Sequence, residues 1–231
     1  MMFHSKSCFY VVLGLLFITL KVGAGDIATF VDLGFSPDNK VYMFAQYGVQ
    51  SKLYKAWADI FVIDVVKNNF VPGGKASLVH NEPVIAGQDG AGALYQILAS
   101  NASLANRYGI NYLRQGETLY IAPEETTNAP VECRDFKTGI VYKATLVESV
   151  EGTGSSLTSS FYINLEQTSA NGAKKNYKVG TPQVKRSLIT AYHIKRIIIS
   201  PKSNALIMVI TMQKKSDNDF DIRYMVEAVH L

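Results

Sequence analysis

The side chains most able to bind a partner are basic and lie close together in the second half of the sequence. Between Gln167 and Ser216 there are ten Lys and Arg residues and no acidic residue. Such a stretch would attract anionic polymers, lipid headgroups or acidic protein surfaces, although it is also typical of a solvated strand face. The predicted anion- or partner-binding residues are Lys174, Lys175, Lys178, Lys185, Arg186, Lys195 and Arg196.

Residues that could catalyse a reaction or hold a metal are few and scattered. His80, His193 and His230 have no partner at the spacing of a metal site, and no Gly-x-Ser-x-Gly motif is present. Cys133 with a distant histidine would imitate a thiol hydrolase, but burial is the simpler expectation for this cysteine. The sequence therefore predicts no catalytic residue, metal or cofactor. A hydrolase whose site is assembled only in the fold is the alternative.

Two polar loops and one strand carboxylate have both a functional and a structural interpretation. Residues 87–92 are glycine-rich and precede a helix, so their amides could bind an anion, but capping explains them more simply. Residues 217–221 resemble the start of a calcium loop but lack its glycine and its final glutamate, which favours a polar hairpin tip. Asp64 lies in an apolar strand, where we expect it to pair with Lys or Arg.

The first 24 residues have the three parts of a cleavable secretory signal. Lys6 precedes an apolar run over residues 9–20, and small residues lead to a cut near Ala24/Gly25. Twelve apolar residues are too few to span a membrane, which needs about 20. Cleavage would lower the Lys and Arg count from 23 to 21 against 19 acids, a net charge of +2, and would leave Cys133 as the lone cysteine. We therefore expect a secreted or periplasmic protein.

The remaining residues, 25–231, predict a single β-rich domain with one inserted helix. Strands are expected over residues 27–36, 40–47, 59–66, 117–122, 140–150 and 159–167, with the third strand ended by Asn68-Asn69 and Pro72-Gly73-Gly74. Apolar residues recur at helical spacing over 90–108, with Asp89 as N-cap and Gly109 beyond the C-terminus. Asn171-Gly172 predicts a two-residue hairpin turn.

A strand–turn–strand pattern occurs near both ends of that domain. Residues 35–44 align with residues 199–208 around the turns at Ser36-Pro37 and Ser200-Pro201, and each unit is followed by an Asp-Ile strand beginning at Asp59 or Asp221. The fold class is therefore mainly β, with two blade-like, three-stranded antiparallel meanders at the two ends. Because the ends are built alike, we expect strands 28–35 and 222–229 to pair in one sheet, which would protect an edge.

The repeat unit resembles the blade of the periplasmic TolB-type β-propellers, in which a Ser-Pro-Asp turn joins two strands; the second copy has Lys202 at the Asp position. Only two units are found, fewer than the four blades that a propeller needs. Nearly the whole domain resembles a bacterial, largely spirochaetal family of predicted secreted proteins with a domain of unknown function. The stretches that carry this resemblance are residues 28–38, 44–48, 70–74 and 224–227.

Together these features favour a non-enzymatic binding or scaffold module of the cell envelope. The family resemblance implies secretion and brings no activity. The expected partner is another envelope protein or an anionic envelope polymer or lipid that binds residues 174–196. Nucleic acid is not expected, because the chain carries a secretory signal and lacks interleaved aromatic platforms. No transmembrane segment is expected after the signal is removed.

Overall fold

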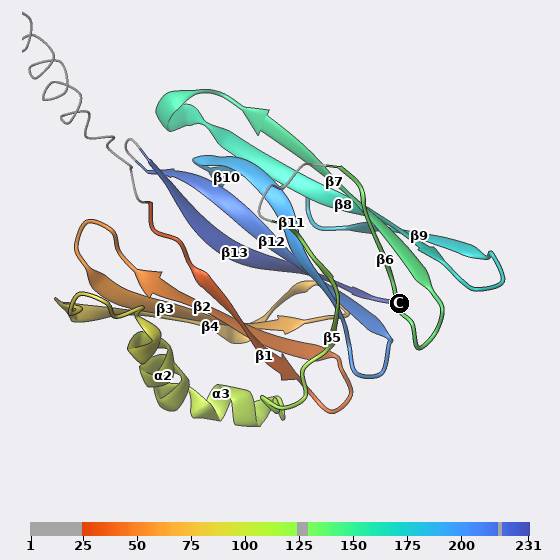
Figure 1. Ribbon diagram of the computed structural model, residues 1–231, viewed down its shortest axis with the longest axis horizontal. Coiled ribbons are helices and arrows are strands. Elements are labelled where there is room, and N and C mark those ends of the chain that lie inside the picture. Colours follow the sequence, from red (N-terminus) through yellow and green to blue (C-terminus); the bar gives the residue numbers. More distant parts are fainter. Residues whose placement is uncertain (1–24, 124–128, 217–218) are drawn as a thin grey trace, which may run out of the picture.

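The computed structural model describes residues 25–123, 129–216 and 219–231, most of which lie in antiparallel strands (Figure 1). The first four strands form one sheet, the N-terminal sheet, in chain order. Its members are β1 (Thr29–Phe35), β2 (Val41–Val49), β3 (Lys55–Asp64) and β4 (Asn69–Pro83). Each strand pairs with its sequence neighbour, so this sheet is built from local turns.

Two further sheets contain the rest of the chain. The central sheet has the order β13-β12-β11-β5, where β5 is Glu117–Ile121, β11 is Ile189–Ile199, β12 is Ala205–Ser216 and β13 is Asp219–His230. The outer sheet has the order β10-β8-β7-β6, with β9 also paired to β8. Its strands are β6 (Val131–Arg134), β7 (Val141–Glu151), β8 (Thr158–Thr168), β9 (Lys174–Val179) and β10 (Arg186–Ser187). The predicted mainly β, antiparallel fold class is confirmed.

The predicted helix over 90–108 forms as two, α2 (Ala91–Ser100) and α3 (Ala102–Arg107). Asn101 separates them because its backbone leaves the helical region and its side-chain amide donates to the carbonyl of Ile97 at 2.9 Å. Gly90, with φ of 84°, holds the N-cap position, and Asp89 accepts a bond from the amide of Ala91. Gly109 has the positive φ expected beyond a helix end. A short 3₁₀ turn, η2 (Gly154–Ser156), joins β7 to β8.

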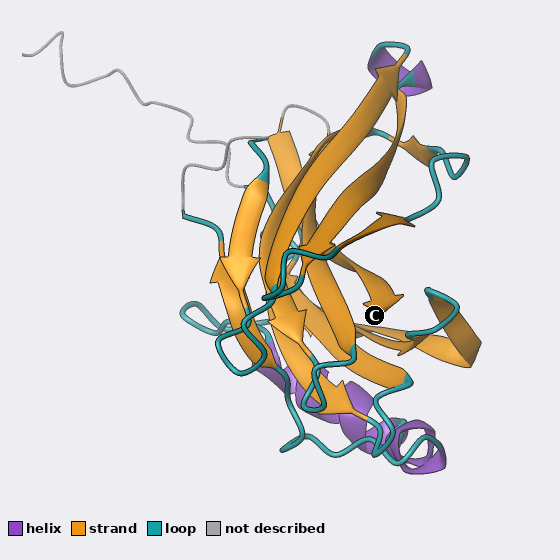
Figure 2. Cartoon of the chain, turned by 90° about the vertical axis from the view of Figure 1, so that its right-hand side faces the viewer, coloured by secondary structure: helices purple, strands orange, loops and turns teal. Residues whose placement is uncertain are grey.

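The layers are stacked in the order helices, N-terminal sheet, central sheet, outer sheet. Both helices lie on the side away from the outer sheet (Figures 1 and 2). Three apolar cores fill the interfaces, and β12 contributes to two of them. Leu206, Met208 and Ile210 face the outer sheet, whereas the alternating residues Ala205, Ile207 and Val209 face the N-terminal sheet. The central sheet is therefore buried on both faces, which explains its continuous apolar sequence.

The two predicted meanders, β1-β2-β3 and β11-β12-β13, have matching turns. In both, the turn serine bonds through its side chain to a later strand amide, Ser36 Oγ to Val41 N at 3.0 Å and Ser200 Oγ to Ala205 N at 3.1 Å. The residues two positions after the prolines, Asn39 and Ser203, both have positive φ. Because Asn39 Nδ2 donates to Asn204 Oδ1 at 3.1 Å, the two turns lie against each other.

The prediction that the two terminal strands pair in one sheet is wrong. β1 lies in the N-terminal sheet and β13 in the central sheet, and the segment before β1 meets β13 through an isolated parallel bridge, Ile27 to Ile222, rather than through a strand ladder. The meanders pack face to face instead. Each has an apolar face, with Phe35 and Phe44 on one and Ile207 on the other, and stacking removes both faces from water. Edge pairing would leave these faces exposed.

Two predicted turns also differ from the structure. Strand β4 continues through Pro72-Gly73-Gly74, where a register irregularity and the positive φ of Gly73 absorb the kink. Proline is tolerated because β4 is an edge strand, whose outward groups need no partner strand. The β8–β9 hairpin spans residues 169–173 rather than two residues, because Ser169 and Ala173 close it outside Asn171-Gly172.

A buried ion pair fixes the start of the fold. The carboxylate of Asp26, whose side chain is 5% exposed, accepts a hydrogen bond from Arg223 Nη2 at 2.7 Å. The guanidinium also lies 4.3 Å from the ring centre of Trp57 on the neighbouring sheet. Burial raises the pKa of Asp26, and the charge of Arg223 opposes that rise. The pair therefore links β13, β3 and the segment that leads into β1.

Glu227 of β13 makes a second junction between sheets. Its buried carboxylate accepts a hydrogen bond from Asn68 Nδ2 in the β3–β4 turn, and Asn68 Oδ1 accepts from the amide of Ala228 at 2.7 Å. Gly180, next to the outer sheet, lies beside this carboxylate, and a Cβ there would lie 3.4 Å from the carboxyl carbon. Burial raises the pKa of Glu227, while Asn68 and Arg186 oppose the rise.

Replacing Arg223 by Ala should lower the free energy of unfolding by about 3 kcal/mol, because it leaves the Asp26 carboxylate buried without its partner. Urea denaturation measures this change. The control is Lys67→Ala, which removes an ion pair to Asp64 in which the Lys67 side chain is 78% exposed, and which should change stability by less than about 1 kcal/mol. Equal effects of the two substitutions would contradict the structural role of the Asp26–Arg223 pair.

The raised pKa of Glu227 predicts a pH dependence of stability. The folded state holds the proton more tightly than the unfolded state, so this contribution is present at low pH and is lost as the pH rises through the folded pKa. Between roughly pH 4 and pH 8 the wild type should lose stability relative to Glu227→Gln, which stays neutral. Urea denaturation across this range tests it, with the exposed carboxylate variant Glu82→Gln as control. Parallel curves for wild type and Glu227→Gln would refute the prediction.

Candidate ligand surface on the outer sheet

The outer sheet has one covered face and one solvent face, and the alternation of its strands separates them. On β7 and β8 the residues Tyr142, Ala144, Ile163 and Leu165 point into the core shared with the central sheet. The residues between them are polar. This pattern is expected for an antiparallel sheet at the end of a stack, where only one face is buried. The outward face is therefore a surface that no other layer of the described structure covers.

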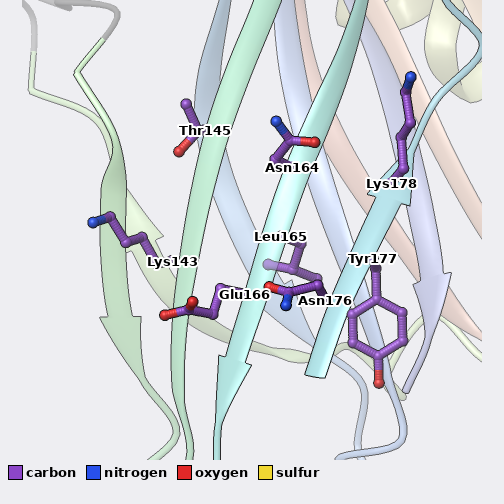
Figure 3. A pocket seen from close by; sticks show the side chains of 8 residues that line it. All are labelled: Lys143, Thr145, Asn164, Leu165, Glu166, Asn176, Tyr177 and Lys178. Atoms are coloured by element: carbon purple, nitrogen blue, oxygen red, sulfur yellow. The ribbon is translucent and has the colours of Figure 1, made fainter. Parts of the chain in front are cut away.

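The outward residues surround a hollow of about 530 Å³ on β7, β8 and β9 (Figure 3). Strand register places them in two rows, one formed by Lys143, Glu166 and Asn176 and the next by Thr145, Asn164 and Lys178. Leu165 and Tyr177 complete the lining. Since neighbouring strands lie about 4.8 Å apart, the residues within each row are close together, and the hollow presents ammonium, carboxylate, amide and hydroxyl groups at close spacing.

Charged groups on this face have defined partners. Glu166 forms an ion pair with Lys174 at 3.0 Å, and Lys178 Nζ lies 4.1 Å from the ring centre of Tyr162 on β8. The hydroxyl of Tyr177 donates to Gln167 Oε1 at 2.9 Å. These contacts hold the lysines of β9 beside the hollow.

The structure separates the seven basic residues predicted from the sequence. Lys174 and Lys178 lie on the outward face, whereas Lys175 falls on the other face of β9, opposite Gln167. Lys185 pairs with Glu151. Arg186 lies on the inner side of the outer sheet, 5.3 Å from the ring centre of Phe161.

Lys195 and Arg196 lie at a register irregularity of β11 in the central sheet, and Arg196 stacks 5.7 Å from the ring centre of Phe30. Of the seven, therefore, only Lys178 lines the hollow, and Lys174 lies beside it through its ion pair with Glu166. They are joined there by Lys143 of β7, which the sequence reasoning missed because it lies far from the basic stretch. The signal for it was present: Lys143 alternates with Tyr142 and Ala144 in a strand pattern.

The other predicted sites have structural explanations. In the glycine-rich loop, the Asp89 carboxylate accepts a hydrogen bond from the amide of Ala91, and that amide is one that a bound anion would need. The same carboxylate lines a second hollow of about 530 Å³ beside His80. Asp64 pairs with Lys67 at 3.6 Å, as predicted. Residues 217–218 lie outside the described residues, and β12 and β13 pair up to Ser216 and Asp219 on either side of them.

Cys133 is buried in the core of the outer sheet, as expected. Burial and the nearby charge of Glu132 raise the pKa of the thiol to about 11, so it is a poor nucleophile. Over the residues that the structure describes, no group of three or more His, Cys, Asp or Glu side chains is arranged to hold a metal ion. No helix in the described ranges has the length and apolar character needed to cross a bilayer.

The burial of Cys133 predicts slow thiol chemistry. At pH 8 in native buffer, Ellman's reagent should react at least about 100-fold more slowly with the folded protein than with the urea-unfolded protein, because little thiolate forms and access is blocked. The absorbance of the released thionitrobenzoate measures both rates. Equal rates would show that the thiol is accessible in the folded state and would restore it as a candidate nucleophile.

A family model described as "Predicted secreted protein (DUF2259)" matches residues 43–230, which run from β2 to the end of β13 and include every residue around the hollow. No curated protein matches the chain. Since the matched region covers most of the sequence, the chain belongs to the DUF2259 family of predicted secreted proteins.

Proposed function

We propose that this protein is a non-catalytic binding module of the cell envelope and that the outward face of the outer sheet is its ligand surface. One observation carries the proposal: the stack covers both faces of the central and N-terminal sheets but only one face of the outer sheet. The face left open is lined by hydrogen-bonding side chains around a hollow. Ligand sites are concave, and convergent polar groups in them fix the orientation of the ligand.

The proposed location is the periplasm or the exterior, reached with a signal peptide cut near Ala24/Gly25. Membership in a family of predicted secreted proteins supports this. Residues 25–231 would then form one domain. The largely spirochaetal membership of the family and the relation to TolB-type blades remain predictions, the latter supported by the matching Ser-Pro turns.

The proposed partner is an envelope protein or an anionic envelope polymer. The proposed contact surface includes fewer basic residues than the stretch 174–196 that the sequence indicated. Lys174 and Lys178 remain contact residues. The ion pair of Lys185 and the ring contacts of Arg186 and Arg196 favour structural roles for those three side chains. Neither a cofactor nor a nucleic acid is part of the proposal.

Site-specific photo-crosslinking tests whether this face is the binding surface. A photoreactive amino acid at Asn176, on the rim of the hollow, should yield a discrete crosslinked species in intact cells of the source organism. The same substitution at the exposed Ser77 of β4, on the N-terminal sheet, is the matched control and should yield none. Crosslinks from Ser77 but not from Asn176 would place the binding surface elsewhere and overturn the proposal.

A further inference from the structure

We propose that the ligand of the outward face is an acidic polysaccharide, an inference that rests on the proposed binding function. Sequence reasoning assigned anion binding to a continuous stretch of chain. The structure assembles a different set, in which Lys143 of β7 joins Lys174 and Lys178 of β9 across β8. Three strands thus contribute to one hollow. The side chains that line it favour one class of partner over the others.

The charge of the face favours an anionic ligand. Glu166 is the one carboxylate among the described residues that line the hollow, and Lys174 neutralises it at 3.0 Å. Lys143 and Lys178 line the same hollow. Arg134 and Glu132 of β6 extend the face, since Glu132 lies opposite Lys143 in register and Arg134 is two residues further along the strand. Four basic side chains therefore stand against two acidic ones, so the face attracts negative charge.

The uncharged groups favour hydroxyl-rich ligands. Thr145, Asn164 and Asn176 line the hollow between the lysines. Amides and hydroxyls both donate and accept hydrogen bonds, which matches sugar hydroxyl groups, whereas a carboxylate or phosphate only accepts. A lipid phosphate accepts from the lysines but offers no donor to these side chains, and an acidic peptide offers them only its backbone amides and carbonyls. A polysaccharide with carboxylate groups would use both sets of side chains.

The apolar surface argues against the other partner classes. Protein interfaces are anchored by large apolar or aromatic side chains in their centre, and lipid surfaces are bound by exposed apolar residues. Of the large hydrophobic side chains found exposed in the described part of the chain, such as Leu53, Ile85 and Leu113, none lines this hollow. The ring of Tyr162 beside it has Lys178 stacked on one face.

Binding of defined polymers to the purified protein tests the ligand class. Isothermal titration should detect binding of polygalacturonate at about 30 mM NaCl, weakened at about 300 mM NaCl because salt screens the lysines. Dextran, a neutral polysaccharide, should bind at least about tenfold more weakly, as should poly-L-glutamate and vesicles containing phosphatidylglycerol. Poly-L-glutamate and the phosphatidylglycerol vesicles carry negative charge without sugar hydroxyls.

Three variants identify the surface. Lys143→Ala with Lys178→Ala should weaken polygalacturonate binding at least about tenfold, since hydrogen bonds to charged groups contribute about 1.5–3 kcal/mol each. The charge-matched control Lys67→Ala with Lys75→Ala, on the N-terminal sheet, should bind as the wild type does. Glu166→Gln should strengthen binding about threefold, because it removes a negative charge and releases Lys174. A misfolded variant would not bind more tightly, so this gain separates a binding role from a structural one.

The outcomes distinguish this inference from the proposed function. If poly-L-glutamate or the vesicles bind as tightly as polygalacturonate, the ligand class is wrong. If no polymer binds while crosslinking from Asn176 captures a protein, the polysaccharide is also wrong, but the binding surface stands. Polygalacturonate binding that the Lys143 and Lys178 substitutions leave unchanged would overturn the assignment to this face. Binding that is selective, salt-dependent, weakened by those substitutions and strengthened by Glu166→Gln supports it.

Discussion

The rest of the structure depends on the burial of the central sheet on both faces. Its strand β12 alternates between two cores, with Met208 on one side and Ile207 on the other, and neither side chain is exposed. An apolar strand of this kind needs a layer above and a layer below it. The N-terminal and outer sheets are these layers. Each of these two sheets has a second face that does not contact the central sheet, and the two second faces differ in whether they are covered.

The N-terminal sheet covers its second face with α2 and α3, which bury Leu94, Ile97 and Leu104 against it. The outer sheet makes its second face polar instead, with Lys143, Asn164 and Lys178 at the outward positions. The stack is therefore capped at one end and open to solvent at the other. That asymmetry, rather than any single reactive residue, singles out the outward face as the candidate functional surface.

Polar contacts fix how the layers are aligned. Asn39 and Asn204 join the two Ser-Pro turns, Asp26 and Arg223 join the start of the chain to β13, and Asn68 supports Glu227. Each of these contacts links segments more than 150 residues apart in sequence. Apolar packing specifies that the faces meet, but it tolerates sliding. Directional hydrogen bonds at the edges give the layers a single alignment.

The sequence by itself determined the mainly β class, the two meanders with their Ser-Pro turns, the helical segment and the burial of Cys133, because periodicity, turn residues and hydrophobicity act over a few neighbouring residues. Only the tertiary structure decided that the meanders stack in separate sheets, that Asn101 divides the helix, and that Lys143 joins Lys174 and Lys178 while Arg186 and Arg196 turn elsewhere. Which face of a strand is covered depends on layers contributed by distant parts of the chain. A stretch of sequence that carries one charge sign can therefore be divided among several surfaces once it folds.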